Sequence, residues 1–210
     1  MSSVSIAQSH DHAEAGAVAA THRPLGWYGM AFFIASEAVF FANLIAAYLY
    51  LRVRAGAWPI PSEMAQYHFT LNKVLIGINT LILLSSSFPM HYAGRSAVRG
   101  NRRGLIIGLA GTIILGAVFL SIQLWEYIHS TFGAQSGVFG STFFTLTGFH
   151  GAHVTAGALF LIVCLVRSIR GDFTAQHHFA VQAAEMYWHF VDVVWVVLFT
   201  VLYLITPVPM

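Results

Sequence analysis

The chain has 210 residues, of which 57% are hydrophobic and only 9% are charged, and its formal net charge is +2. Because a soluble domain usually has about a quarter of its residues charged, this composition excludes an ordinary soluble protein and predicts an integral membrane protein. The net charge is too small to indicate a nucleic-acid partner. Cys164 is the only cysteine, which excludes an intrachain disulfide and a cysteine-based metal site and predicts a packed thiol.

The first 24 residues are polar, and we expect them to form a tail that precedes a single transmembrane domain over residues 25–210. The tail has no apolar region of the kind found in a cleavable signal peptide. Its segment from Ser9 to His12 could bind a metal weakly, but a polar tail without a metal is the expectation that we carry forward.

Five apolar segments follow, each long enough to cross the hydrocarbon core as a helix, which takes about 20 residues; the second is only just long enough. Backbone groups in lipid must be hydrogen-bonded within their own segment, so we expect helices and not open strands. The predicted fold class is therefore all-α, an integral membrane bundle of five transmembrane helices. Their approximate bounds are 27–51, 74–90, 105–127, 142–166 and 180–205.

Basic residues are unequally divided between the two sides of this bundle. One side, which includes the N-terminus and the second and fourth loops, carries Arg23, Arg95, Arg99, Arg102, Arg103, Arg167 and Arg170. The other side carries Arg52, Arg54 and Lys73. Because cytoplasmic loops are enriched in arginine and lysine, we expect the N-terminus inside and the C-terminus outside.

Glycines predict where helices approach one another closely. Gly104 and Gly108 have the four-residue spacing of a close-packing pattern. Gly148, Gly151 and Gly157 surround two histidines in the fourth span, so we expect that helix to pack against protein and not to face lipid on all sides.

Glu37 is an ionisable residue at mid-depth in the first span. It lies ten residues after Trp27, which corresponds to about 15 Å along a helix and to the midplane of a core about 30 Å thick. A lone charge at that depth costs at least about 2.5–3.5 kcal/mol. We therefore expect Glu37 to be protonated or to face a partner or a lipid headgroup, and a neutral packing role is the alternative.

Five further residues are predicted to form an intramembrane polar network: His150, His153, Glu185, His189 and Asp192. The first two lie one helical turn apart and are expected to share a face. The last three, at i, i+4 and i+7, form one stripe, and His153 could meet His189. A proton relay, a metal site and a packing network are all possible readings. The Glu-x-x-His spacing of di-iron bundles is missing, so we favour a closed hydrogen-bond network.

Near the outer end of the third span, Gln123 and Glu126 share one face. Glu126 could form an ion pair with Arg52 or Lys73, which are expected on the same side of the membrane. We interpret this pair as structural.

Four motifs resemble subunit III of haem-copper terminal oxidases, the cytochrome c oxidase subunit III family. They are SEAVFF (36–41), QLWEY (123–127), GFHGAHV (148–154) and YWHFVDVVW (187–195), and the last two are long and specific. The match extends from about residue 27 to the end. With five predicted spans, the chain resembles the five-helix bacterial form of the family. Longer members carry two further helices, which line the lipid cleft.

The resemblance implies a non-catalytic subunit of an aerobic respiratory oxidase in the bacterial plasma (inner) membrane. Such a subunit packs directly on subunit I, shares the complex with subunit II and a small subunit IV, binds phospholipid and supports proton uptake. It has no cofactor, since the haems and copper belong to its partners. Glu37 matches the family's buried carboxylate near the lipid cleft and proton entry.

Several alternatives remain open from the sequence. Glu37 favours a cytochrome c oxidase over a quinol oxidase, and the related subunit of a nitric oxide reductase is a further possibility. A catalytic subunit I would need more histidine ligands than this chain has at membrane depth. A stand-alone proton-coupled transporter is motivated by the mid-depth acids, although we find no internal repeat or broken helices of the transporter kind. The histidines motivate a small haem- or metal-binding redox protein.

Overall fold

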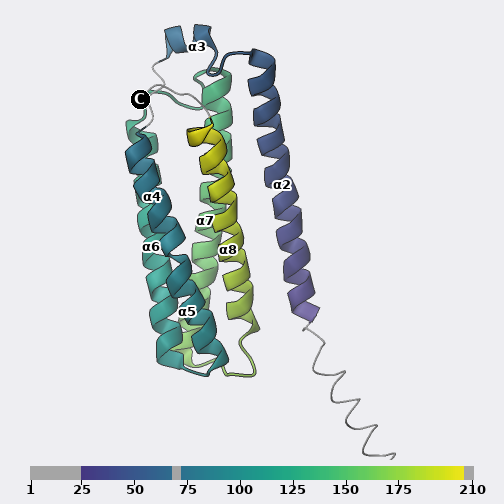
Figure 1. The fold of residues 1–210 in the computed structure, drawn as a ribbon. Coiled ribbons are helices and arrows are strands. Elements are labelled where there is room, and N and C mark those ends of the chain that lie inside the picture. Colours follow the sequence, from purple (N-terminus) through teal and green to yellow (C-terminus); the bar gives the residue numbers. More distant parts are fainter. Residues whose placement is uncertain (1–24, 68–71, 206–210) are drawn as a thin grey trace, which may run out of the picture.

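The computed structural model describes residues 25–67 and 72–205, and in these ranges every regular element is helical. The elements are α2 (Leu25–Ala55), α3 (Pro61–Gln66), α4 (Lys73–Ser85), α5 (Ser87–Val98), α6 (Arg102–His129), α7 (Gly137–Arg170), α8 (Phe179–Phe199) and the short π-helix η1 (Thr200–Leu204) (Figure 1). The predicted tail over residues 1–24 lies outside the described residues.

Within the described ranges, five helical stretches are long and apolar enough to cross a membrane, which confirms the predicted number of spans. They are Leu25–Ala55, Lys73–Val98, Arg102–His129, Gly137–Arg170 and Phe179–Leu204. Most extend beyond the predicted bounds, because helices continue past the apolar run into residues such as Arg52 and Arg54, whose charges are stabilised at a helix C-terminus. The second span extends furthest past a predicted end, to Val98 instead of residue 90, and α4 gives way to α5 at Ser86 within this one crossing.

Helix α8 is the central element of the bundle. It packs against α2, α4, α5 and α7, and 56% of the residues in its most apolar 18-residue segment are buried. Helix α2 lies at the edge of the bundle, where it contacts α7 and α8 (Figure 1). Only 6% of the residues in its most apolar 18-residue segment are buried. One long helix is therefore enclosed by protein, while the first span exposes most of its surface to its surroundings.

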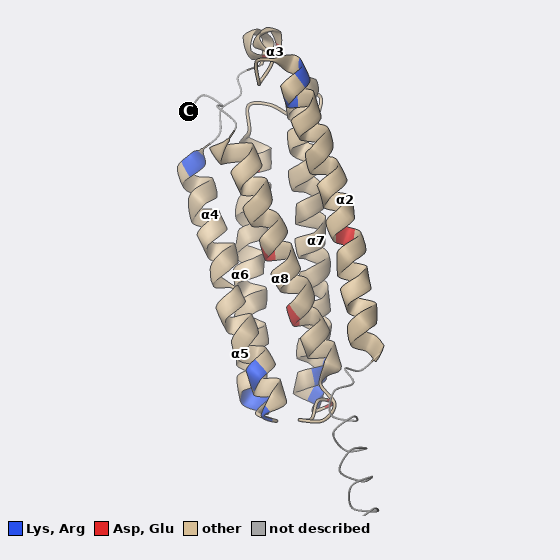
Figure 2. Ribbon diagram, turned by 45° about the vertical axis from the view of Figure 1, so that its right-hand side comes forward, with Lys and Arg blue, Asp and Glu red and all other residues tan. Residues whose placement is uncertain are grey.

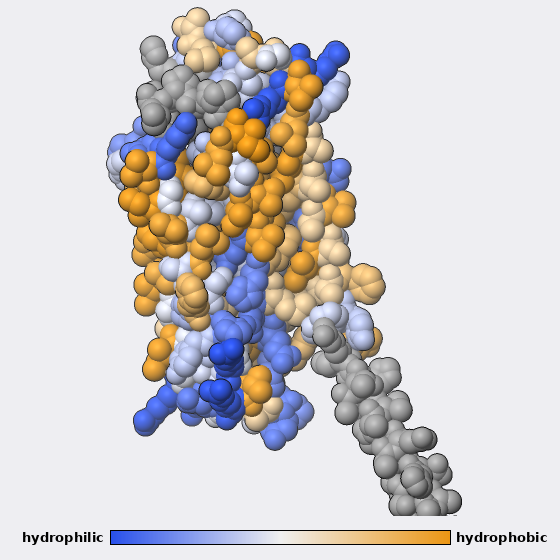
Figure 3. Space-filling model, viewed as in Figure 1, coloured by the Kyte–Doolittle hydropathy of each residue, from blue (hydrophilic) through white to orange (hydrophobic). Residues whose placement is uncertain are grey.

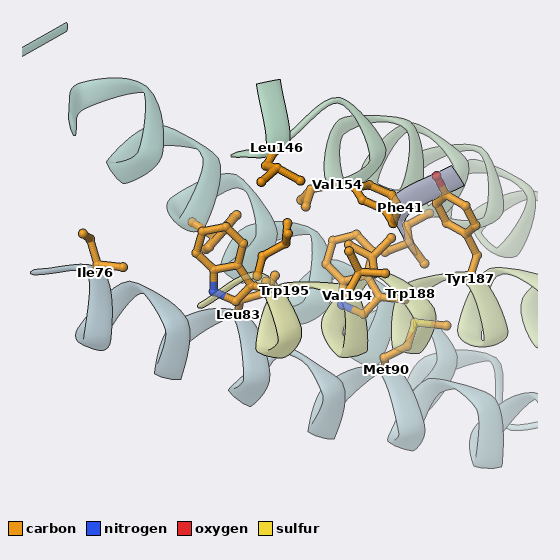
Figure 4. Packing of buried hydrophobic residues seen from close by; sticks show 14 of the residues in the cluster. Phe41, Ile76, Leu83, Met90, Leu146, Val154, Tyr187, Trp188, Val194 and Trp195 are labelled. Carbon is orange, nitrogen blue, oxygen red and sulfur yellow. The ribbon is translucent and has the colours of Figure 1, made fainter. Parts of the chain in front are cut away.

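Two tryptophans of α8 fill the middle of the core (Figure 4). Both Trp188 and Trp195 are completely buried. The indole N–H of Trp188 donates to Ser86 Oγ at 2.9 Å, and that of Trp195 donates to Thr80 Oγ1 at 3.0 Å. Each large ring thus contributes apolar contact while its one polar group is satisfied by the helix pair α4–α5.

The glycine prediction is confirmed for α6 and wrong for part of α7. A Cβ added at Gly108 would lie 2.6 Å from the carbonyl oxygen of Pro89, and Gly104 also faces α5. By contrast, a Cβ at Gly148 or Gly151 would meet nothing within 4 Å. The two α7 glycines therefore leave open space within this chain, and the close helix approach that they were expected to permit is not found.

Helix α3 was not predicted, because six residues are too few to show a helical period. Its Glu63 accepts hydrogen bonds from the backbone N–H groups of Val138 at 2.8 Å and Phe139 at 3.3 Å. These donors are free at any helix start, so the carboxylate caps α7 from another element.

Charged residues mark the two ends of the bundle. Lysine and arginine lie near helix ends, while acidic residues occur within the length of α2 and α8 (Figure 2). On the face shown in Figure 3, the surface between the ends is mostly apolar, except for a hydrophilic band that rises over α5 and α8 from one end. Basic residues thus concentrate at the two ends of the bundle, while Glu37, Glu185 and Asp192 lie along the length of α2 and α8.

Candidate functional site

The mid-depth polar residues do not form the single network that the sequence predicted. They separate into a pair between α2 and α7, a cluster between α5 and α8, and an isolated histidine in the core. The separation follows from helix geometry, since residues on one helix only a few positions apart can face different neighbours.

Glu37 of α2 and His153 of α7 form the first site. The distance between Glu37 Oε2 and His153 Nε2 is 2.9 Å, and their side chains are 25% and 16% exposed. This contact is the polar link that fixes α2, the least embedded helix, to the rest of the bundle at mid-depth. The sequence identified both residues but did not predict that they meet.

The hydrogen-bond geometry determines the charge of this pair. The other ring nitrogen of His153, Nδ1, lies 2.7 Å from the carbonyl oxygen of Phe149, which can only accept, so Nδ1 carries a hydrogen. One further hydrogen must lie between Nε2 and Glu37. Either a protonated Glu37 donates to a neutral imidazole, or an imidazolium donates to a carboxylate. In both states the pair has zero net charge and holds one transferable proton.

Aromatic rings surround the pair. The ring of Phe41 meets that of His153 edge-on at a centroid distance of 4.8 Å, and Phe40 stacks on it at 6.2 Å. The Tyr187 hydroxyl of α8 donates to the carbonyl oxygen of His153 at 3.4 Å. An apolar enclosure strengthens a hydrogen bond between such groups and makes a lone charge there costly, which favours the net-neutral pair.

The second site is the α5–α8 seam, which we define as Ser87, His91, Glu185, His189 and Asp192. Glu185 Oε1 lies 3.2 Å from His91 Nδ1 and 3.8 Å from His189 Nε2. His189 Nδ1 lies 3.2 Å from the hydroxyl oxygen of Ser87, which in turn donates to Asp192 Oδ2. The predicted stripe on α8 is therefore present, and its partners come from α5.

Sequence reasoning missed Ser87 and His91. The second span was expected to end at residue 90, which placed His91 outside the membrane, and a serine in an apolar run gives no distinctive signal. Gly94 lies beside this cluster, since a Cβ there would lie 2.1 Å from Glu185 Oε2. The carboxylate of Glu185 thus occupies the space that this glycine leaves on α5.

The expected meeting of His153 with His189 does not occur, because the first turns to α2 and the second to α5. His150 is also separate from His153. It is 1% exposed and lies between Trp195, stacked at 4.7 Å, and Phe119, edge-on at 6.0 Å. Neither of its ring nitrogens has a hydrogen-bond partner among the described residues. Three positions on a helix correspond to a rotation of about 60°, which is enough to turn His150 into the core.

Near the C-terminal end of α6, Gln123 is 5% exposed, and Glu126 lines a cavity of about 330 Å³ together with Tyr127. The Tyr127 hydroxyl donates to Thr147 at 2.5 Å. The predicted ion pair of Glu126 is not observed: Arg52 instead donates to the carbonyl oxygen of Ile205 at 2.9 Å. A backbone acceptor nearer to the end of α2 therefore takes the guanidinium.

The described helices contain no group of three or more His, Cys, Asp or Glu side chains placed to hold a metal ion. The side chains that the sequence considered for a metal within the spans are instead divided between the pair, the seam and the isolated His150. The chemistry that these residues can carry is hydrogen bonding between helices and the storage of a proton.

Comparisons with known proteins agree with the motifs. The sequence model of the family described as Cytochrome c oxidase subunit III matches residues 8–206. The chain is 43% identical over 186 residues to cytochrome c oxidase subunit 3 of Synechocystis sp., covering 88% of this chain and 77% of the relative. It is 42% identical over 182 residues to the protein of that name from Equus caballus, covering 84% and 68%. For Struthio camelus the identity is 44% over 181 residues, with 84% and 68% covered.

Proposed function

Because the chain belongs to the cytochrome c oxidase subunit III family, we propose that it is the non-catalytic membrane subunit of an aerobic respiratory oxidase that reduces dioxygen to water. The observation that carries this proposal is the family match over nearly the whole chain. The relatives are named for cytochrome c, which supports cytochrome c over quinol as the electron donor.

In this proposal the haems and copper lie in partner subunits, with subunit I in direct contact and subunit II and a small subunit IV in the same complex. The dispersal of the histidines supports this role. His150 lies between aromatic rings, His153 contacts Glu37, and His189 contacts Ser87, so each is engaged separately. A copper centre or a haem with two histidine ligands would require such side chains to converge.

Glu37 and His153 then serve proton uptake and the attachment of α2. A pair that holds one proton without net charge can sit beside lipid at low cost and can exchange that proton with a nearby acceptor in the partner. The exposed apolar surface of α2, including Phe32 and Val39, is suited to phospholipid chains, and bound phospholipid completes the proposal.

We also propose that the N-terminal side faces the cytoplasm of a bacterial cell, in the plasma (inner) membrane. Among the described residues, the end of the bundle formed by the α5–α6 and α7–α8 connections has Arg95, Arg99, Arg102, Arg103, Arg167 and Arg170. The opposite end has Arg52, Arg54 and Lys73. The excess of basic residues supports this orientation.

Purification of the tagged chain from its native membrane in mild detergent tests the proposed function. We expect a haem-bearing partner and oxidase activity to co-purify, and we expect the chain, once separated from its partners, to show no haem absorption. Haem absorption of the separated chain would identify it as a redox protein in its own right. Proton-linked flux through the chain reconstituted alone would favour a transporter.

A substitution at Glu37 separates its proposed role from haem binding. Glu37→Ala should leave the haem spectrum of the assembled oxidase unchanged, because no haem ligand is removed. In the unaltered complex near neutral pH, an apolar carbodiimide should label Glu37, since the side chain is 25% exposed at membrane depth and shares a proton with His153. Glu37→Gln is the control that should abolish this label. A label on Glu126 or Glu185 that spares Glu37 would contradict the assignment.

A further inference from the structure

A cavity of about 330 Å³ lies at the C-terminal end of α6. Its lining includes Glu126 of α6 and Asn72, which directly precedes α4. Helix α6 has 28 residues, whereas about 20 suffice to cross the hydrocarbon core, so its last turn reaches the level of the lipid headgroups. Glu126 belongs to that last turn, three residues before His129. The cavity is therefore placed where a headgroup can enter it.

Two opposite charges at this cavity do not meet. Glu126 Oε1 is buried without a hydrogen-bond partner, and the carboxylate forms no ion pair with another described residue. Lys73, which the sequence suggested as its partner, directly follows Asn72 and likewise forms no ion pair within the described ranges. A charge near the hydrocarbon core is costly unless it is matched. The cavity thus lacks a positive group for Glu126 and a negative group for Lys73.

Aromatic rings form much of the remaining wall. The ring of Phe144 lies 4.8 Å from that of Tyr127 and 5.7 Å from that of Phe132, measured between centroids. Trp125 stacks on His129 at 4.4 Å. All five of these side chains line the cavity. Aromatic faces attract organic cations, and cages of such rings recognise ammonium groups. The carboxylate and the rings together therefore favour an ammonium group.

We propose that this cavity binds the headgroup of a zwitterionic phospholipid, with the ammonium group at Glu126 and the phosphate towards Lys73. Leu124 and Ile128, which are 59% and 70% exposed, form the adjoining face of α6 and would contact the acyl chains. The site is separate from the surface of α2 proposed above for phospholipid chains. It depends on the membrane location of the chain and goes beyond the proposed role in an oxidase.

Other occupants match the cavity less well. A phospholipid with an anionic headgroup brings no cation to Glu126. A metal ion needs several further ligands, and the described helices place no three His, Cys, Asp or Glu side chains together. A free amine matches Glu126 but leaves Lys73 unmatched and covers none of the exposed apolar surface. A zwitterionic headgroup matches both charges.

Photo-crosslinking tests the proposal in the intact assembly, purified in mild detergent and depleted of lipid. A benzophenone amino acid replaces Ile128, and phosphatidylethanolamine and phosphatidylglycerol with the same acyl chains are added in equal amounts. We expect the phosphatidylethanolamine adduct, identified by mass, to exceed the phosphatidylglycerol adduct about tenfold. A benzophenone at Ile114 of α6, which is 62% exposed, should show no preference between the lipids. Equal adducts at Ile128, or an adduct there with another polypeptide, would overturn the proposal.

Glu126→Gln should abolish the preference for phosphatidylethanolamine, because the side chain keeps its shape and loses its charge. Glu63→Gln is the matched control. Glu63 hydrogen-bonds the start of α7 and does not line the cavity, so this variant should keep the preference of the unaltered chain. A preference that survives Glu126→Gln would contradict the assigned ammonium contact. The result does not depend on whether a haem-bearing partner co-purifies, so it is separable from the test of the proposed function.

Lys73→Met tests the phosphate contact in the same assay. The yield of lipid adduct should fall several-fold, while the preference for phosphatidylethanolamine persists because Glu126 remains. A rise in yield would show that Lys73 competes with the lipid for Glu126 and would overturn the assignment. Free ethanolamine in large excess should leave the yield unchanged, since it brings neither a phosphate nor acyl chains. Competition by ethanolamine as strong as that by the lipid would assign the cavity to a free amine instead.

Discussion

Trp188→Ala is expected to lower the free energy of unfolding of the chain by about 3–5 kcal/mol, the range seen when a large buried aromatic is truncated. The ring is completely buried at the centre of the bundle. It lies against Gly116 and Gly157, where an added Cβ would come within 2.7 Å and 3.1 Å of it. Helices α6 and α7 have no side chains at those positions that could move into the cavity.

The substitution also removes the hydrogen bond from the indole N–H to Ser86 Oγ, at the point where α4 gives way to α5. Unfolding of the purified chain in detergent, followed by circular dichroism, measures the effect. Trp125→Ala is the matched control, because Trp125 is 53% exposed, and it should change the stability far less. Equal losses for the two variants would show that α8 does not form the core of the bundle.

Gly108→Ala should destabilise the chain by about 1–3 kcal/mol, the usual cost of overpacking. The new methyl group would lie 2.6 Å from the carbonyl oxygen of Pro89 and 2.8 Å from the backbone nitrogen of Ala93. Because both are backbone atoms, neither can rotate away, so α5 and α6 must separate. The same unfolding measurement checks this result.

Gly148→Ala is the control for that experiment. A Cβ at Gly148 meets nothing within 4 Å, so the change should be neutral in the isolated chain or stabilising by up to about 1 kcal/mol, through the helix propensity of alanine. A loss of stability at Gly148 as large as that at Gly108 would contradict the packing described for α6 and α7.

The glycine pairs show where sequence reasoning about packing is reliable. The spacing of Gly104 and Gly108 puts them on one face of α6. Helix α5 packs against this face, because a short connection joins the two helices. Gly148 and Gly151 are also small residues one turn apart, but they line a cavity between α6 and α7, and a Cβ at either would meet nothing within 4 Å. Spacing therefore predicts a smooth helix surface, and only the fold decides whether a neighbour occupies it.

The extent of the second span illustrates a different failure. An apolar count ends at about residue 90, but the helix continues to Val98, because His91 and the arginines beyond it can be helical without being lipid-compatible. Because the predicted span ended before His91, the sequence did not predict that α5 contributes residues to the seam. A polar residue just beyond a predicted span is a candidate member of a polar cluster when a neighbouring helix carries an acid at the same depth.

The sequence by itself determined the number of membrane helices, their order and the family, because a lipid environment admits few backbone conformations and requires long apolar runs that are easily recognised. It also singled out Glu37, His153, Glu185 and His189, because ionisable residues in such runs are rare. Only the tertiary structure decided that Glu37 meets His153 and that Glu185 and His189 meet α5. These pairings depend on the rotation of each helix about its axis and on which helices are its neighbours. Both are set when the whole bundle packs around Trp188, Trp195 and the glycines, and no single segment of the sequence determines them.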